Sequence, residues 1–175
     1  MNETGFDGFD DAIYRIQGWD FFAAGGALYN NLDYSFTVGH ENGTFQPPAT
    51  TPGGGSAALR KQLGFMKRVF DRLDLAKARP LDGVSSHARC LGAAGEFYLC
   101  YAHYGEKRNG FRPSYAVETA RKTVAWRMQV PAGRYQAVWL DPKSGKELGR
   151  AEFDATGSLT TPEHTEDIAL ELRRL

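Results

Sequence analysis

The sequence lacks an excess of either charge, a long apolar run and a segment resembling a secretion signal. Lysine and arginine total 21 against 21 aspartates and glutamates, so no net field attracts a polyanion and we expect no nucleic-acid partner. No uninterrupted apolar stretch approaches the roughly 20 residues of a membrane-spanning helix, so we expect no membrane partner. The acidic, glycine-rich first residues have neither the basic nor the apolar region of a signal peptide, which leaves the localisation unassigned.

Cysteines and metal-ligand patterns are sparse as well. The two cysteines, Cys90 and Cys100, flank a predicted hairpin turn at residues 93–95. Strand register decides whether their side chains face each other; we favour two buried thiols that act as small apolar residues, with a disulfide as the alternative. The four histidines show no ligand-like spacing with the cysteines, so we predict no metal and no cofactor.

Apolar residues recur at helical spacing in two segments, residues 12–23 and 59–73. An aspartate at position 10 or 11 can cap the first helix, and two glycines at positions 25 and 26 end it. Ser56 is a suitable N-cap for the second helix. Residues 27–38 between the helices are rich in aromatic and β-branched side chains, which favours a short strand running into a loop.

After residue 80 the pattern changes to a period of two. Residues 123–130 alternate apolar and polar side chains, and residues 134–140 continue as a second strand with apolar residues on both faces. We expect the Pro-Ala-Gly segment at 131–133 to turn the chain between them. A second turn at residues 141–145 leads to a third strand. Three more strands are predicted at residues 87–91, 96–102 and 168–172. Six or so short strands joined by tight turns predict an antiparallel β-sandwich.

Polar and aromatic residues are dense in the first forty positions. They comprise Glu3, Asp7, Tyr29, Asn30, Asn31, Asp33, Tyr34 and His40. Planar aromatics cover the apolar faces of sugar rings, and amides and carboxylates pair with hydroxyls, so this composition suits a carbohydrate site. The alternative is that the tyrosines pack in the core while the asparagines satisfy loop backbone. We expect His164 and Glu166, near the last strand, to be ordinary surface residues.

Three segments in the first half of the sequence carry a resemblance to a known family. Residues 2–8 (Asn-Glu-Thr-Gly-Phe-Asp-Gly) and residues 24–41 (Ala-Gly-Gly-Ala-Leu-Tyr-Asn-Asn-Leu-Asp-Tyr-Ser-Phe-Thr-Val-Gly-His-Glu) are followed by a third matching stretch at 59–79. Together they resemble the end of a bacterial (β/α)8 glycoside hydrolase-like family. Members of that family often carry a C-terminal β-sandwich labelled as collagen-binding, to which residues 135–145 and 165–170 are similar.

The resemblance implies an α+β fold with two parts. Residues 1–79 would be a remnant of a (β/α)8 barrel, with two helices and a short strand, and residues 80–175 a small antiparallel β-sandwich. Glu3 would end the seventh barrel strand, where retaining relatives hold the nucleophile. The resemblance implies carbohydrate as the ligand of a family that is often secreted. It implies a sugar site shaped by Tyr29, Asn31, Asp33, Tyr34 and His40.

The second catalytic group is missing from this pattern. Hydrolysis needs two carboxyl groups about 5 to 10 Å apart, and the resemblance places the proton donor on an earlier barrel strand. We therefore predict a C-terminal fragment of a glycoside hydrolase-like protein that is inactive alone and has the missing barrel portion as a partner.

Three functions make different structural predictions. A hydrolase fragment predicts that Glu3 lies within hydrogen-bonding reach of the sugar-site residues. A structural domain that packs on a catalytic partner predicts an exposed apolar stripe over residues 59–73. A non-catalytic module that binds polysaccharide or protein predicts an exposed aromatic strip drawn from Tyr98, Tyr101, Tyr115 or Tyr135.

Overall fold

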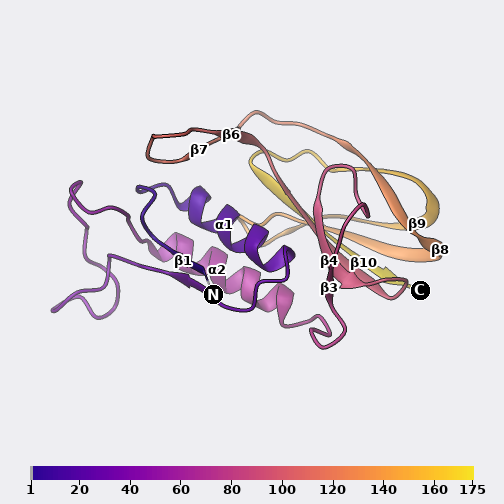
Figure 1. The fold of residues 1–175 in the computed structure, drawn as a ribbon, viewed down its shortest axis with the longest axis horizontal. Helices are drawn as coiled ribbons and strands as arrows, with labels where there is room; N and C mark the ends of the chain where they lie inside the picture. Colours follow the sequence, from indigo (N-terminus) through magenta and orange to yellow (C-terminus); the bar gives the residue numbers. More distant parts are fainter. Residues whose placement is uncertain (1) are drawn as a thin grey trace.

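The computed structural model describes residues 2–175 and shows a mixed α+β chain (Figure 1). Its helices are α1 (Asp11–Ala23) and α2 (Ala57–Phe70). Two short strands, β1 (Asn2–Thr4) and β2 (Tyr29–Asn31), precede α1 and α2 respectively. The remaining strands are β3 (Arg79–Leu81), β4 (Arg89–Ala93), β5 (Phe97–His103), β6 (Gly105–Lys107), β7 (Tyr115–Val117), β8 (Ala125–Leu140), β9 (Glu147–Thr160) and β10 (Asp167–Arg174).

Both predicted helices and their caps are confirmed. The Asp10 carboxylate accepts a hydrogen bond from the Ala12 backbone N–H at 2.9 Å, and the Ser56 hydroxyl accepts one from the Leu59 N–H at 2.8 Å. Each bond satisfies a donor that the first helical turn leaves unpaired. Ser56 also donates to Asp11 Oδ2 at 2.6 Å. This bond joins the two N-terminal ends, and Figure 1 shows the helices running side by side in the same direction from there.

The short strands β1 and β2 form a parallel pair that α1 connects. Parallel neighbours joined by a helix make a βαβ unit. The predicted strand in residues 27–38 is confirmed over Tyr29–Asn31 alone. The chain leaves the strand at Asp33, whose carboxylate accepts a hydrogen bond from the Ser35 backbone N–H at 3.0 Å, a local turn that competes with strand pairing.

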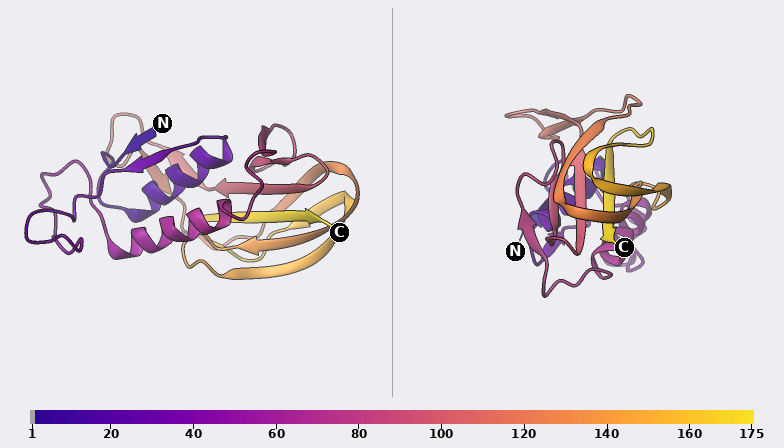
Figure 2. Two further views of the ribbon diagram at one scale, coloured as in Figure 1. Left: turned by 90° about the horizontal axis from the view of Figure 1, so that it is seen from below. Right: turned by 90° about the vertical axis from the view of Figure 1, so that its right-hand side faces the viewer.

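Six strands form one antiparallel sheet in the order β3-β4-β5-β10-β8-β9. The last strand, β10, lies in the middle, between β5 and β8. Ile168, Leu170 and Leu172 lie together in one apolar cluster, as predicted for one face of the strand, while Ala169 between them is buried in the cluster on the other face. Figure 2 shows the sheet extending beyond the helices, with the C-terminal strand running between its neighbours.

The expected turn at residues 131–133 is wrong. These residues lie inside β8, where the pairing with β9 shifts register between Gln129 and Arg134. Trp126 and Trp139 would lie about 40 Å apart in a straight strand, yet their ring centroids are 5.0 Å apart. The β8–β9 ribbon therefore bends over its own face of the sheet. One bent sheet thus replaces the two facing sheets that the sequence predicted.

Apolar clusters cover both faces of this sheet. The bent ribbon encloses the first cluster, which includes Trp126, Tyr135 and Trp139. The second lies between the sheet and the C-terminal halves of the helices and includes Trp19 and Tyr101. Because the second cluster draws residues from both sides of position 80, the helices and the sheet share one core.

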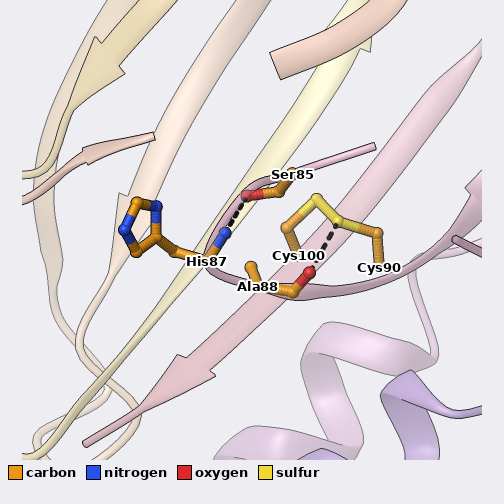
Figure 3. The surroundings of a disulfide bond; sticks show 5 residues. All are labelled: Ser85, His87, Ala88, Cys90 and Cys100. Atoms are coloured by element: carbon orange, nitrogen blue, oxygen red, sulfur yellow. Dashed lines mark hydrogen bonds between the residues drawn. A yellow bond between two sulfur atoms is a disulfide. The ribbon is translucent and has the colours of Figure 1, made fainter. Parts of the chain in front are cut away.

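A disulfide bond joins Cys90 and Cys100 across the β4–β5 hairpin (Figure 3). The register places the two residues directly opposite each other, so both side chains point to the same face. Both are buried, as predicted, but the favoured interpretation as free thiols is wrong. The sequence could not fix the register that decides between the two states.

Replacing both cysteines with alanine is expected to lower the free energy of unfolding by about 2–3 kcal/mol, because the unfolded chain regains the freedom of a short loop. Guanidinium denaturation of the oxidised protein and of the double variant measures this difference. Wild-type protein unfolded in the presence of a reductant is the control and should match the variant. Equal midpoints for the oxidised protein and the variant would contradict the expectation.

Candidate functional site

The ends of β1 and β2 place Glu3 beside Asn30. The two residues are register partners, and neighbours in parallel strands project from the same face. Both are exposed, whereas the next residue along β1, Thr4, is buried. Glu3 lines an open hollow of about 370 Å³ together with Phe6 and Asp7. This face of the strand pair therefore presents a carboxylate and an amide to solvent.

Tyr29 and Asn31 lie on the opposite face, toward α1. Thr4 Oγ1 is 2.9 Å from the Tyr29 hydroxyl and 3.0 Å from Asn31 Oδ1. The Tyr29 hydroxyl donates to the backbone carbonyl of Tyr14 in α1 at 2.8 Å. Burial raises the pKa of Tyr29 to about 12, so this hydroxyl stays a neutral donor near pH 7. These contacts anchor the strand pair to the helix.

Asp33 holds the loop after β2. Its Oδ1 accepts a hydrogen bond from the Ser35 hydroxyl at 2.5 Å, and its Oδ2 accepts one from Arg60 Nη1 of α2 at 2.7 Å. Burial acts to raise the pKa of Asp33, but the bonds from Ser35 and Arg60 more than offset it and hold this pKa below its usual value. Asp33, Tyr29 and Asn31 line a second hollow, of about 520 Å³, against α2.

Tyr34 and His40 lie in the loop that continues from Asp33. The backbone N–H of Tyr34 donates to the Gly54 carbonyl at 3.1 Å, and His40 Nδ1 is 3.1 Å from Thr44 Oγ1. Across residues 2–175, no side-chain hydrogen bond joins Glu3 to any of the five predicted sugar-site residues. The structure thus brings Tyr29, Asn30, Asn31 and Asp33 to one hollow and places Glu3 at another.

Asp7 connects the segment after β1 to a distant hairpin. Its Oδ1 accepts a hydrogen bond from the Ser114 backbone N–H at 2.6 Å, and its Oδ2 accepts one from the Ser114 hydroxyl at 2.5 Å. Ser114 immediately precedes β7 of the β6–β7 hairpin. The Tyr14 hydroxyl of α1 accepts from the Asp7 backbone N–H at 3.0 Å. Asp7 is therefore fixed from two sides next to the hollow that Glu3 lines.

Asn30 and Ser114 show what sequence reasoning missed. Asn30 belonged to the polar cluster but not to the implied sugar site; parallel pairing of the two strand ends would have aligned it with Glu3. Ser114 lies 107 residues from Asp7, and nothing local in the sequence signals their contact.

A binding module was expected to expose an aromatic strip, but three of the four tyrosines named for it are buried. Tyr98, Tyr101 and Tyr135 are at most 1% exposed, and Tyr115 is half-buried. Tyr101 donates its hydroxyl hydrogen to Asp167 within the core at 2.9 Å. These rings pack in the interior, so they present no platform to a ligand.

Two further expectations are wrong. The apolar stripe of residues 59–73 does not stay exposed, because α1 and the sheet bury Leu59, Met66 and Phe70. His164 and Glu166 are not surface residues, with exposures of 6% and 8%. Glu166 is buried because it forms ion pairs with Arg15 at 2.6 Å and with Lys143 at 2.6 Å.

The described part of the chain carries neither a metal-ligand cluster nor a helix suited to a membrane. Within residues 2–175, no group of three or more His, Cys, Asp or Glu side chains is arranged to hold a metal ion. Neither α1 nor α2, the helices of this described range, has the length and apolar character needed to cross a bilayer.

Known proteins were compared with the chain by sequence and by structure. No family model matches the sequence, and no curated protein matches it. A glycoside hydrolase family 5 protein from Bacteroides vulgatus ATCC 8482 superimposes with a TM-score of 0.64 at 14% identity, over 94% of this chain and 36% of that one. A GH30 endoxylanase from Clostridium papyrosolvens C71 gives a TM-score of 0.50 at 11% identity, over 100% of this chain and 41% of that one.

Both solved structures are much longer than this chain, which spans between a third and a half of their length. At these identities the likeness concerns the fold. The chain therefore has the fold of a portion of glycoside hydrolase family 5 and GH30 proteins, with two helices followed by a mainly antiparallel sheet.

Proposed function

We propose that the chain is the C-terminal part of a carbohydrate-active glycoside hydrolase-like protein. Residues 1–79 would supply the last two strand and helix units of a (β/α)8 barrel, and residues 80–175 an accessory domain. The missing barrel portion is then its structural partner, and carbohydrate is the ligand of the assembled protein.

The observation that carries this proposal is the β1–α1–β2–α2 unit. Its strands are parallel, α1 connects them, and Glu3 and Asn30 are exposed register partners on the two strands. In a closed barrel, alternate residues of each strand face the helices and the interior, and the active site lies at the carboxyl ends of the strands. Glu3 and Asn30 occupy the interior-facing positions in such an arrangement.

Glu3 is the proposed nucleophile. A carboxylate at this position attacks the anomeric carbon while a second carboxylic acid protonates the leaving oxygen, giving a covalent glycosyl-enzyme that water hydrolyses. Asn30 stands beside it as a donor to a sugar hydroxyl. In this proposal Asp33, Tyr34 and His40 shape the rim of the site, while Tyr29 and Asn31 contribute by holding the strand ends in place.

The six-stranded sheet has a structural role in this proposal. It packs on the helices through a shared apolar cluster, so it covers helix surface that solvent would otherwise contact. With the proton donor on another part of the barrel, the chain alone is expected to be inactive.

Unactivated glycosides, whose leaving oxygen must be protonated, test this proposal on the purified chain. We expect the wild-type chain and Glu3→Gln to show the same background rate of hydrolysis, because the acid that protonates the leaving group is not on this chain. Glu3-dependent hydrolysis of an unactivated glycoside by the chain alone would show that a complete site is present and would overturn the proposal.

A polypeptide that also contains the remaining barrel units tests the role of Glu3 directly. There, Glu3→Gly should abolish hydrolysis, and added azide should restore turnover by attacking the anomeric carbon in place of the carboxylate. A Glu3→Gly variant that keeps full activity would assign the nucleophile to another residue.

A further inference from the structure

Three of the four exposed phenylalanines in the described chain lie on two segments that meet at Asp7 and Ser114. Phe6 and Phe9 flank Asp7 in sequence and are 44% and 47% exposed, and Phe111, three residues before Ser114, is 61% exposed. Figures 1 and 2 both show the β6–β7 hairpin beside the segment that follows β1. The segments that carry these exposed rings therefore adjoin each other after β1, and Phe6 shares a hollow with Glu3.

The loop that presents Phe111 is ordered by its own contacts. The Arg108 backbone N–H donates to the Ser114 carbonyl at 2.7 Å and closes the loop, and the Phe111 N–H donates to the Arg108 carbonyl at 3.2 Å. The Arg108 guanidinium lies 4.9 Å from the centre of the Phe111 ring. A ring held over one face by a cation keeps its other face available.

The attachment of this loop to the strand end is as specific. Both Asp7 carboxylate oxygens are occupied by Ser114, one by the backbone N–H and one by the hydroxyl. Bonds to an ionised carboxylate are stronger than bonds between neutral groups, so they fix the loop against residues 5–8. Phe6, from this same segment, lines the hollow of about 370 Å³ with Glu3.

We propose that the loop of residues 108–114 forms one wall of the carbohydrate site, with Phe111 and Phe6 as stacking platforms for sugar rings and Ser114 as the residue that positions the wall through Asp7. This inference rests on the proposed function but extends it, because it makes the β6–β7 hairpin, which lies outside the six-stranded sheet, a contributor to substrate binding. An exposed planar ring stacks on the apolar face of a sugar, whereas a protein partner would bury these rings against side chains. The ligand is an oligosaccharide that extends beyond the sugar unit bound at Glu3.

Soluble β-linked hexasaccharides of xylose, glucose and mannose are the probes. Each is titrated into the isotope-labelled 175-residue chain, with amide shifts mapping the contact and calorimetry giving the affinity. We expect shifts in residues 5–9 and 108–114 with at least one probe. Phe111→Ala should weaken that binding by about 2- to 12-fold, and Phe111→Trp should retain it.

Matched variants separate stacking from positioning. Leu75→Ala, at an exposed apolar residue after α2, should leave the affinity unchanged. Ser114→Ala should weaken binding by freeing the loop, and Ser114→Thr, which keeps the hydroxyl, should restore it. Thermal unfolding of each variant checks that the fold is intact, since Phe111 and Ser114 are both exposed.

The outcome also separates this inference from the role of Glu3. Hexasaccharide binding is measured without turnover, so the result for Phe111→Ala holds whether or not Glu3 proves to be the nucleophile. Absence of binding by all three probes, shifts confined to other segments, or equal affinity in Phe111→Ala and wild type would each overturn the inference. Protection of Phe111 by the missing barrel portion with no sugar binding would assign these rings to a protein interface instead.

Discussion

Arg15→Ala is expected to lower the free energy of unfolding by about 3–5 kcal/mol, because it leaves a buried carboxylate without its counter-charge. Arg15 is 1% exposed and lies between α1 and the start of β10. Its Nε donates to Asp167 Oδ2 at 2.9 Å and its Nη2 to Asp167 Oδ1 at 3.1 Å. Its Nη2 also donates to Glu166 at 2.6 Å, and its Nη1 to Gln62 of α2 at 2.9 Å.

The charge state of this cluster follows from its partners. Burial opposes the positive charge of Arg15, but Asp167 and Glu166 outweigh burial and raise the pKa of Arg15. Burial raises the pKa of Asp167, and Arg15 and Tyr101 limit the rise. Removing Arg15 therefore leaves the free-energy cost of burying the Asp167 carboxylate without the ion pair that offsets it.

Guanidinium denaturation at neutral pH measures the effect. Arg89→Ala is the matched control, because Arg89 pairs with Asp20 on the surface and exposed pairs stabilise little. Arg15→Met combined with Asp167→Asn removes both charges and should recover part of the lost stability. A loss in Arg15→Ala no larger than that in Arg89→Ala would show that the cluster does not hold the helices to the sheet.

Trp19→Ala is expected to cost about 3–5 kcal/mol, because it opens a large cavity between α1, α2 and the sheet. The indole is fully buried and stacks on Tyr101 of β5, with ring centroids 5.3 Å apart and planes 16° apart. Its centroid is also 5.6 Å from that of Phe70 and 6.3 Å from that of Phe65, both in α2. One side chain thus contacts all three elements that meet in the core.

A graded series tests this interpretation. Trp19→Phe should cost clearly less than Trp19→Ala, since it retains a ring and also removes an indole N–H that has no hydrogen-bond partner within the described structure. Val38→Ala, at a side chain 93% exposed, is the control and should change the unfolding midpoint little. Similar losses for Trp19→Phe and Trp19→Ala would point to a specific role of the indole instead of to cavity size.

The sequence predicted the features that local chemistry decides. The helix starts at Asp10 and Ser56 were readable because each cap bonds a backbone N–H two or three residues away. The alternation in residues 168–172 was readable because strand side chains repeat every two residues. Long-range partners were not readable: Arg15 meets Asp167 across 152 residues, and no local pattern distinguishes such an arginine from one on a surface.

Ambiguous local signals explain the other differences. Pro131 and Gly133 are equally compatible with a tight turn and with a β-bulge. Because β8 pairs with β9 on both sides of these residues, the bulge forms. The pairing of Cys90 with Cys100 likewise depended on hairpin register. Glu3 was found through family resemblance, whereas Asn30 and Ser114 needed the parallel register and the hairpin contact that only the folded chain provides.

The placement of the three tryptophans has a practical consequence for following the protein in solution. Trp19 lies in the cluster beneath the helices, while Trp126 and Trp139 lie together in the cluster under the bent ribbon. Intrinsic fluorescence from a chain that keeps Trp19 alone would report separation of the helices from the sheet. Near-ultraviolet circular dichroism of the close indole pair would report straightening of the ribbon, so two optical signals resolve the two sides of one sheet independently.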